Sequence, residues 1–274
     1  MPVTQAEKVA QFRALHAAPG AFVIANAWDA GSTRMLAALG FPAIATSSGA
    51  CAGVLGRRDG AVTREEALDH AAAIVAATDL PVSADLEKCF ADDPAGVAET
   101  IRRAAATGLA GGSVEDATGD ASRPLFTLEE AVARVAAAAE AARAAPSGFV
   151  LTARTESFLR GNPDLDDVIR RLRAFAAAGA EVLMAPGLPD LDAVRAVCAA
   201  VDRPVNFMGG IRGKSFSVAE LQAAGVKRVS LATSLYRAAM TGLLSAAREV
   251  REQGTFGYLD GTLATPELNA FMAG

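Results

Sequence analysis

Short apolar runs alternate with longer amphipathic stretches along most of the chain. Between the runs lie alanine-rich segments whose apolar positions recur with a helical period. Many of these segments end in a glycine just before the next apolar run, as expected for a helix cap. The pattern predicts eight strand–helix units. The apolar runs occupy residues 22–27, 43–48, 81–87, 111–116, 149–155, 181–187, 204–210 and 228–234.

Eight units with nearly continuous apolar strands predict parallel strands covered by helices. Their number and the chain length favour a closed (β/α)8 TIM-type barrel over an open doubly wound sheet. No GxGxxG motif follows the first strand, which weakens a dinucleotide-binding alternative. We expect an extra N-terminal helix over "QAEKVAQFRALHAA" and a long helix from about residue 234 to 253 after the last strand. With no linker or low-complexity segment, residues 1–274 are predicted to form a single domain.

Composition narrows the class of protein. The chain has 274 residues, of which 51% are hydrophobic and 21% charged, enough for a large core. A net charge of −5 without a basic cluster argues against nucleic acid as a partner. We expect no membrane segment and a cytoplasmic protein, because no apolar run reaches the length of a span and no signal region is evident. Three cysteines and two histidines are too few and too scattered for a disulfide framework or a zinc site.

Charged residues gather where the predicted strands end, which is where barrels of this type carry their chemistry. The third strand ends in Asp85 and Glu87, which share a face because side chains alternate along a strand. The fourth ends in Glu115 and the fifth in Arg154. Crowded carboxylates repel unless a cation neutralises them, and oxygen ligands suit Mg²⁺ or Mn²⁺. The sequence predicts a metal site here, with Arg154 holding an anionic group of the substrate; the alternative is that the acids cap the following helices.

Four stretches together resemble the isocitrate lyase / phosphoenolpyruvate mutase superfamily: "NAWDAGSTRMLAALGFPAIATSSGA", "DLPVSADLE", "GGSVEDATGD" and "FVLTARTESFLRG". The similarity extends roughly from residue 15 to residue 255. It implies a modified (β/α)8 barrel whose eighth helix is commonly swapped between the subunits of a dimer or tetramer. It also implies Mg²⁺ at the barrel mouth and an α-keto acid, or its enolate, as the reacting group. We therefore expect a homo-oligomer, such as a homotetramer, that acts on a small anionic carboxylate.

The resemblance also implies roles for individual residues. Asp85 would bind the metal directly, and Glu87 and Glu115 would act on it through water. The turn after the second strand would bind the substrate carboxylate, and an acid on the following loop would lie near the reacting atoms. Arg154 would hold the departing or transferred group. Outside the metal site, the predicted substrate-binding and catalytic residues are Trp28, Ser48, Gly49, Ala50, Asp59, Cys89 and Arg154.

The chain departs from the family pattern in ways that bear on the reaction. Cys89 and Ala91 stand where members usually carry glycines, so Cys89 is either a packing residue or a reactive thiol near the cation. The cysteine-bearing loop of isocitrate and methylisocitrate lyases is absent after the fourth strand, and residues 117–125 are short and turn-like. Gly187 follows Pro186 where those lyases have a glutamate. Their retro-aldol reactions are therefore not expected, and a proton would have to come from elsewhere, such as a water on Asp59 or Cys89.

We expect a Mg²⁺-dependent lyase or hydrolase that cleaves a C–C or C–P bond of a small α-keto or 2-hydroxy carboxylate through an enolate stabilised by the metal. One alternative is phosphonate chemistry like that of phosphoenolpyruvate mutase. A second is a catalytically reduced oligomeric binding protein of the same fold. A third is a phosphate-binding barrel that uses backbone donors of residues 209–215 and 232–234, although no strand ends in a lysine suited to a Schiff base.

Overall fold

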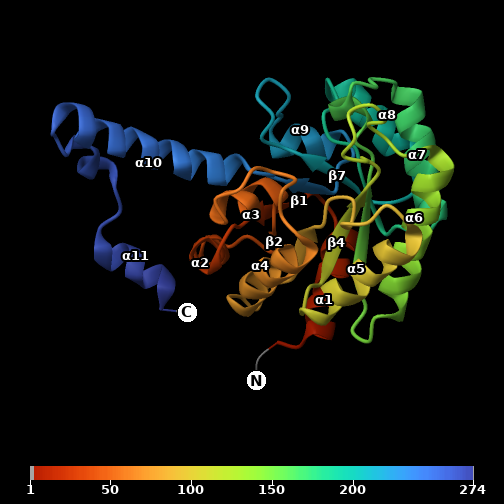
Figure 1. The fold of residues 1–274 in the computed structure, drawn as a ribbon, viewed down its shortest axis with the longest axis horizontal. Helices are drawn as coiled ribbons and strands as arrows, with labels where there is room; N and C mark the ends of the chain where they lie inside the picture. The colour runs from red at the N-terminus through yellow and green to blue at the C-terminus, as the bar shows by residue number, and fades with distance from the viewer. Residues whose placement is uncertain (1–2, 274) are drawn as a thin grey trace.

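A closed barrel of eight parallel strands forms the centre of the molecule in the computed structural model (Figure 1). The structure describes residues 3–273; Met1, Pro2 and Gly274 belong to the predicted single domain but lie outside the described residues. Each strand pairs with its neighbours in chain order, and β8 pairs with β1 to close the barrel. The predicted (β/α)8 class is confirmed. The strands are β1 (Phe22–Asn26), β2 (Ile44–Ala45), β3 (Val82–Asp85), β4 (Gly111–Glu115), β5 (Val150–Arg154), β6 (Val182–Met184), β7 (Val205–Met208) and β8 (Arg228–Ser230).

Most of the helices pack around the outside of this barrel. Several start at a Ser or Thr whose hydroxyl accepts a backbone N–H while a glutamate three residues later bonds back, as at Thr63 with Glu66 and at Thr127 with Glu130. The expected N-terminal helix is present. The helices are α1 (Gln5–Ala17), α2 (Ala30–Ala38), α3 (Ser48–Val54), α4 (Arg64–Ala76), α5 (Pro94–Ala106), α6 (Leu128–Ala144), α7 (Leu165–Ala177), α8 (Leu191–Ala200), α9 (Val218–Ala223), α10 (Ser234–Gln253) and α11 (Thr265–Met272), with 3₁₀ turns η1 (Ser157–Arg160) and η2 (Gly257–Gly261).

Helix α1 packs against the barrel end opposite the predicted site. Its Phe12 is fully buried and belongs to one apolar cluster with Ile24 of β1 and Val150 of β5. His16, one turn further along α1, donates from Nδ1 to the Phe12 carbonyl at 2.8 Å. Its other ring nitrogen faces Arg228 inside the barrel at 3.3 Å. Burial, followed by the charge of Arg228, lowers the pKa of His16 to about 3.

The buried histidine makes stability depend on pH. An unfolded histidine takes up a proton near pH 6.5, whereas folded His16 stays neutral down to about pH 3. The unfolded state therefore binds more protons between these values, so stability is expected to rise as the pH increases from about 4 to about 6.5. The contribution is at most about 1.4 kcal/mol per pH unit. Chemical unfolding of wild type and His16→Gln at several pH values tests this: the variant should show a shallower rise, and equal slopes would contradict the burial of a neutral His16.

The C-terminal part departs from a regular barrel. Helix α10 leaves the barrel as a projecting arm, and α11 returns alongside α2, where Arg34 donates to the Met272 carbonyl (Figure 1). No residue of α10 is buried, and its Leu243 and Leu244 are 60% and 53% exposed. The last helix thus packs on its own chain, while α10 contacts the barrel near its start, through Leu235 and Tyr236. No helix within residues 3–273 combines the length and apolar character that a membrane crossing requires.

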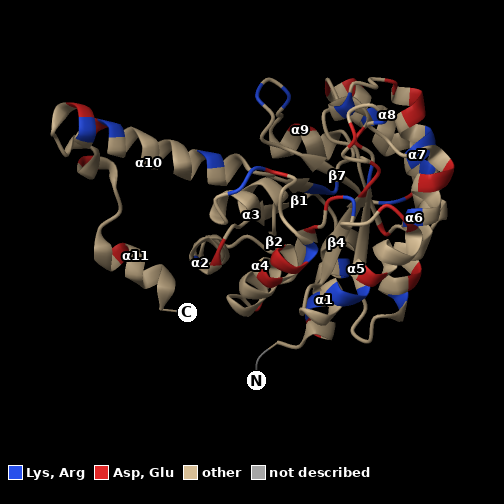
Figure 2. Cartoon of the chain, in the orientation of Figure 1, with Lys and Arg blue, Asp and Glu red and all other residues tan. Residues whose placement is uncertain are grey.

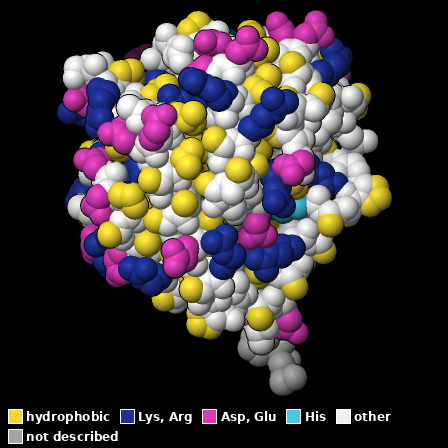
Figure 3. Space-filling view, turned by 90° about the vertical axis from the view of Figure 1, so that its right-hand side faces the viewer, with side chains coloured by type: hydrophobic (Ala, Val, Ile, Leu, Met, Phe, Trp, Pro, Cys, Tyr) yellow, Lys and Arg dark blue, Asp and Glu magenta, His cyan; other side chains and the backbone are white. Residues whose placement is uncertain are grey.

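The side of the molecule opposite the α10 arm carries charged side chains of both signs (Figure 3). On the face shown in Figure 3, acidic and basic side chains are interspersed with hydrophobic ones rather than gathered into a field of one sign.

Candidate active site

Three neighbouring strands bring the predicted charged residues to one end of the barrel. The parallel register pairs Glu115 with Arg154, so these two residues lie at the same height, whereas Asp85 pairs with Ser113, two residues before Glu115 on β4. The Arg154 Nη1 atom lies 3.8 Å from Asp85 Oδ1, and its Nε atom lies 3.6 Å from Glu115 Oε2. Figure 2 shows the acidic and basic segments meeting in the loops above the strands. The end of β5 thus places one cation beside carboxylates from the ends of β3 and β4.

Arg154 is held in this position by a further acid. Its Nε donates to Oε1 of Glu156, whose side chain is only 2% exposed. Burial by itself disfavours the charge of Arg154, but Glu115, Glu156 and Asp85 outweigh it and raise the pKa of the guanidinium. Arg154 is therefore a fixed positive charge that already has partners.

These residues line an open cleft of about 580 Å³ at the barrel mouth, a size usual for a small-molecule site. Ser48, Asp59, Glu87, Glu115 and Arg154 all contribute to its wall. The cleft wall therefore contains five of the ten residues that the sequence predicted at the site, and Asp85 lines the cavity beneath it.

The carboxylates of the cleft are short of positive charge. Burial raises the pKa of Glu87 to about 7, and Asp85 and Asp59 add to the shift more than Arg154 and Lys88 oppose it. Burial also raises the pKa of Glu115, helped by Glu156 and Asp85 and opposed by Arg154. Negative charges that disfavour one another in a partly buried site are stabilised by a bound cation.

The donor set fits a hydrated divalent cation. Asp85 accepts only long hydrogen bonds, from the backbone of Ser48 and of Glu87 at 3.3 Å each and from the hydroxyl of Ser113 at 3.5 Å. Its oxygens thus keep capacity to coordinate. Within residues 3–273 no three Asp, Glu, His or Cys side chains are close enough to enclose a metal by themselves. A cation held here would be bound through few carboxylates and would keep several of its waters.

The loop after β3 has an unusual backbone. Glu87, Cys89 and Phe90 have φ angles of 50°, 60° and 52°, a left-handed conformation that residues other than glycine adopt at a cost. The buried guanidinium of Arg134 stabilises this loop by donating to the Lys88, Ala91 and Asp92 carbonyls at 2.7 Å each. The loop thereby fixes Glu87 and Lys88 at the edge of the cleft.

The side chain of Cys89 points from this loop into the core and does not line the cleft. Its side chain is fully buried in the apolar core, with Sγ 3.9 Å from the Ser113 carbonyl. Burial raises the pKa of its thiol to about 12. These observations favour the packing interpretation of Cys89, and nothing in the geometry supports the reactive thiol or proton donor that the sequence left open.

We expect Cys89→Ala to keep kcat/KM within about threefold of wild type, because the thiol reaches no part of the cleft. The loss of buried volume should lower stability by about 1 kcal/mol. Steady-state kinetics and thermal unfolding check both values. A hundredfold loss of activity with an intact fold would instead make Cys89 a participant in the reaction.

The turn after β2 forms the first residues of α3. Ser48 lines the cleft, whereas Ala50 is buried. A Cβ on Gly49 would lie 2.8 Å from the Thr233 methyl group and 3.2 Å from Asp59 Oδ2, so this close approach requires glycine. Asp59 thus lies close to Gly49, and its role near the reacting atoms stays a prediction.

Trp28 is placed differently from the prediction. Its ring packs edge-on against Tyr236 of α10, 5.7 Å between centroids, and its carbonyl accepts from His70 Nε2 at 2.8 Å. It does not belong to the wall of the cleft. The contact with Tyr236 anchors the start of the arm, and the role of Trp28 in substrate binding stays a prediction.

Two further cations, Arg160 and Lys88, belong to the cleft wall, and Arg160 was not predicted there from the sequence. Arg160, at the end of η1, is 44% exposed and lies 3.7 Å from Glu156 and 4.0 Å from Glu115. Lys88 pairs with Asp92 at 2.6 Å and donates to the Thr118 carbonyl at 2.8 Å. Gly161 ends η1 with a left-handed φ of 83°. A glycine directly after Arg160 is the sequence signal that could have predicted a turn here, and with it the position of Arg160 at the barrel mouth.

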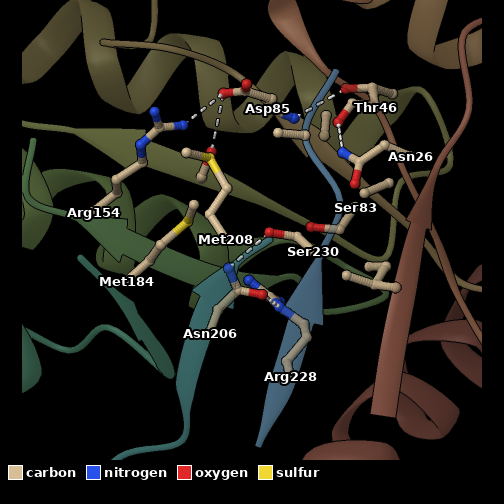
Figure 4. A pocket seen from close by; sticks show the side chains of 15 residues that line it. Asn26, Thr46, Ser83, Asp85, Arg154, Met184, Asn206, Met208, Arg228 and Ser230 are labelled. Atoms are coloured by element: carbon tan, nitrogen blue, oxygen red, sulfur yellow. Dashed lines mark hydrogen bonds and ion pairs between the residues drawn. The ribbon is translucent and has the colours of Figure 1, made fainter. Parts of the chain in front are cut away.

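A second, smaller cavity of about 60 Å³ lies inside the barrel beneath the cleft (Figure 4). Asp85 and Arg154 lie at its upper end, and Asn206, Arg228 and Ser230 lie at its lower end. The thioethers of Met184 and Met208 occupy the space between. Polar residues thus continue from the mouth into the barrel.

Comparison with known proteins identifies the family. Residues 12–251 match the family model described as phosphoenolpyruvate phosphomutase. The chain belongs to this family. The predicted superfamily is thereby confirmed, and with it the expectation of a lyase-type enzyme at the level of the family. An oxaloacetate decarboxylase of Chromohalobacter salexigens is 31% identical over 266 residues, covering 94% of this chain and 87% of that protein.

Solved structures of the family superpose closely on this chain. A Burkholderia cenocepacia protein, provisionally described as a lyase/mutase, has 50% sequence identity and a TM-score of 0.96, with 98% of this chain and 97% of that chain covered. An oxaloacetate acetylhydrolase in complex with its product oxalate has 25% identity and a TM-score of 0.87, with 98% and 94% covered. The fold is therefore shared with a protein whose structure holds oxalate.

Proposed function

We propose that this family member is a Mg²⁺-dependent lyase that cleaves a C–C bond of a small α-keto dicarboxylate of the oxaloacetate type. The observation that carries the proposal is the arrangement at the mouth: the under-coordinated Asp85 carboxylate next to Glu87, Glu115 and a fixed Arg154. The relatives named for oxaloacetate decarboxylation and oxaloacetate hydrolysis support the substrate class.

The residues of the cleft would have three roles: binding the cation, binding the substrate and supplying a proton. Asp85 would hold the cation, with Glu87 and Glu115 bonded to its waters. When bound, the cation would polarise the 2-oxo group and stabilise the negative charge that develops as the neighbouring bond breaks. Ser48 and Gly49 would hold the carboxylate next to that oxo group. Asp59, which lies over Gly49, would hold a water that returns a proton to the carbon where the bond broke.

The far carboxylate of the substrate needs a cation of its own. Arg154 has three acidic partners, so part of its charge is already compensated. Arg160 is more exposed and only loosely paired, at 3.7 Å and 4.0 Å. We therefore assign the far carboxylate to both arginines, with Arg154 as the fixed member and Arg160 as the adjustable one. A substrate with two negative groups is favoured over a monocarboxylate.

A product screen tests the proposal. The pure protein, with and without Mg²⁺, is incubated with oxaloacetate, phosphonopyruvate, substituted malates and methylisocitrate, and products are separated by chromatography. We expect Mg²⁺-dependent turnover of oxaloacetate or a close homologue. Turnover of phosphonopyruvate alone would establish the phosphonate alternative. Turnover of none, with no binding of Mg²⁺, would leave the oligomeric binding protein as the better account.

We also propose that the chain forms a homodimer or homotetramer through the α10 arm, since Leu243 and Leu244 are exposed and cover nothing on their own barrel. Light scattering should give a mass above one chain at micromolar concentration. The double variant Leu243→Glu, Leu244→Glu should shift it to the monomer without loss of helix content. Leu39→Glu is the matched control, because Leu39 is 66% exposed and lies at the C-terminal end of α2, outside α10. A monomeric wild type would contradict the proposal.

A further inference from the structure

Strand β8 carries an arginine into the interior of the barrel. Arg228 is 5% exposed. It donates from Nε to Asn206 Oδ1 at 2.7 Å, from Nη2 to Thr152 Oγ1 at 3.0 Å, and from Nη1 to His16 Nε2 at 3.3 Å. Every one of these partners is a neutral group. His16 Nδ1 uses its hydrogen for the Phe12 carbonyl, so its Nε2 offers a lone pair and no charge.

No carboxylate compensates this buried cation. Across residues 3–273, no Asp or Glu oxygen lies within 4.0 Å of the Arg228 guanidinium. Burial lowers the pKa of Arg228 to about 9, which still leaves it charged at neutral pH. Burying a charge is unfavourable unless an opposite charge accompanies it. Asp85 is the acid that lines the same cavity, but it lies at the other end, 3.8 Å from Arg154.

Two serine hydroxyls join Arg228 in the lining of this cavity, most of which is apolar (Figure 4). Ser230 Oγ accepts from Asn206 Nδ2 at 3.0 Å, so its hydroxyl hydrogen is free to point into the cavity. Ser83 lines the same space from β3. The volume is about 60 Å³, and one water requires roughly 10–15 Å³ of the space open to its centre. There is room for a small inorganic ion with water, but not for a dicarboxylate.

We propose that this cavity binds a small monovalent anion of the size of chloride, held by the Arg228 guanidinium and the Ser230 hydroxyl. The anion supplies the opposite charge that the protein does not place beside Arg228. It is distinct from the substrate, which binds at the mouth above Asp85. The site is built from β3, β7 and β8, so an occupied site ties three strands of the barrel together.

Bromide is the probe for this site, because it scatters anomalously and resembles chloride in size. Crystals of the full chain are grown in sodium bromide, and an anomalous difference map is calculated at the bromine edge. We expect a peak within hydrogen-bonding reach of the Arg228 guanidinium and Ser230 Oγ. Peaks confined to the surface, with ordered water in the cavity, would overturn the proposal. Sodium formate in place of bromide distinguishes a halide site from one that prefers a planar carboxylate.

Stability provides the solution test. Bromide replaces gluconate at constant ionic strength, and thermal unfolding is followed. A ligand at ten times its Kd should raise the unfolding temperature by about 3–6 °C. Ser230→Ala should reduce this rise, and Arg228→Met should abolish it. Arg195→Met removes an exposed arginine of α8 and should leave it intact. If Arg228→Met does not fold, Ser230→Ala and the wild-type map still decide. A wild type indifferent to bromide would overturn the proposal.

Discussion

Replacing Asp85 with alanine is expected to lower kcat/KM by about 10³-fold or more while leaving the fold intact. Removing one preorganised electrostatic stabiliser commonly costs 10²–10³-fold. Asp85 would hold the cation that stabilises the developing negative charge, so its loss should cost at least as much. Asp85 accepts only long hydrogen bonds, and its side chain is 19% exposed. Its loss should therefore disturb packing little. Steady-state kinetics at saturating Mg²⁺, together with circular dichroism, measure both effects.

Two further variants sharpen this experiment. Asp85→Asn keeps the shape but removes the charge, and it should be nearly as inactive as Asp85→Ala. Asp192→Ala removes a 91% exposed aspartate on α8 and should behave as wild type. If Asp85→Ala turns over substrate at the wild-type rate, the assignment of the metal ligand is wrong.

Replacing Arg154 with alanine is expected to raise KM and lower kcat together, with a combined loss of about 10²–10³-fold. The guanidinium would contact the substrate in both the ground state and the transition state, and a lost contact of that kind affects both parameters. Stability should also fall, by about 3–5 kcal/mol, because Glu115 and Glu156 would be left buried without their cation. Kinetics must therefore be measured well below the unfolding temperature of the variant.

Arg160 provides the comparison for this result. It is more exposed than Arg154 and pairs with the same two acids only loosely, so Arg160→Ala should raise KM about tenfold with little loss of stability. Arg154→Lys keeps the charge but loses the planar fork, and it should recover stability better than activity. Unchanged kcat and KM in Arg154→Ala would refute the proposed role of Arg154.

The barrel could be predicted because its signals are local and repeated. Each apolar run in the sequence contains one strand of the structure. The helices before the first strand and directly after the last, α1 and α10, lie where the pattern predicted them. The course of α10 after it leaves the barrel could not be predicted. Its leucine-bearing face is equally compatible with covering the barrel or with projecting from it, and the difference depends on what the rest of the fold leaves open.

The site was predictable as far as strand ends determine position. Glu115 and Arg154 are neighbours because the parallel register pairs them, and the long Arg154 side chain reaches Asp85 at the end of β3. The hydrogen-bond and ion-pair partners of Arg154 depend on the conformation of η1, and the burial of Cys89 depends on the left-handed loop that begins at Glu87. Neither conformation could be predicted from the sequence. Arg228 was detectable in principle, since an arginine within an apolar strand of a barrel has to be buried or to interrupt the strand.

Calorimetric titration with Mg²⁺ and oxalate tests the central claim most directly, because oxalate mimics the enolate of an α-keto acid. The account predicts that oxalate binds wild type tightly with Mg²⁺ present and at least about tenfold more weakly without it. By reciprocity, oxalate should tighten Mg²⁺ binding by the same factor. Asp85→Ala should lose this coupling. Oxalate binding that is equally strong with and without Mg²⁺, or coupling that survives in Asp85→Ala, would contradict a metal-dependent site at the barrel mouth.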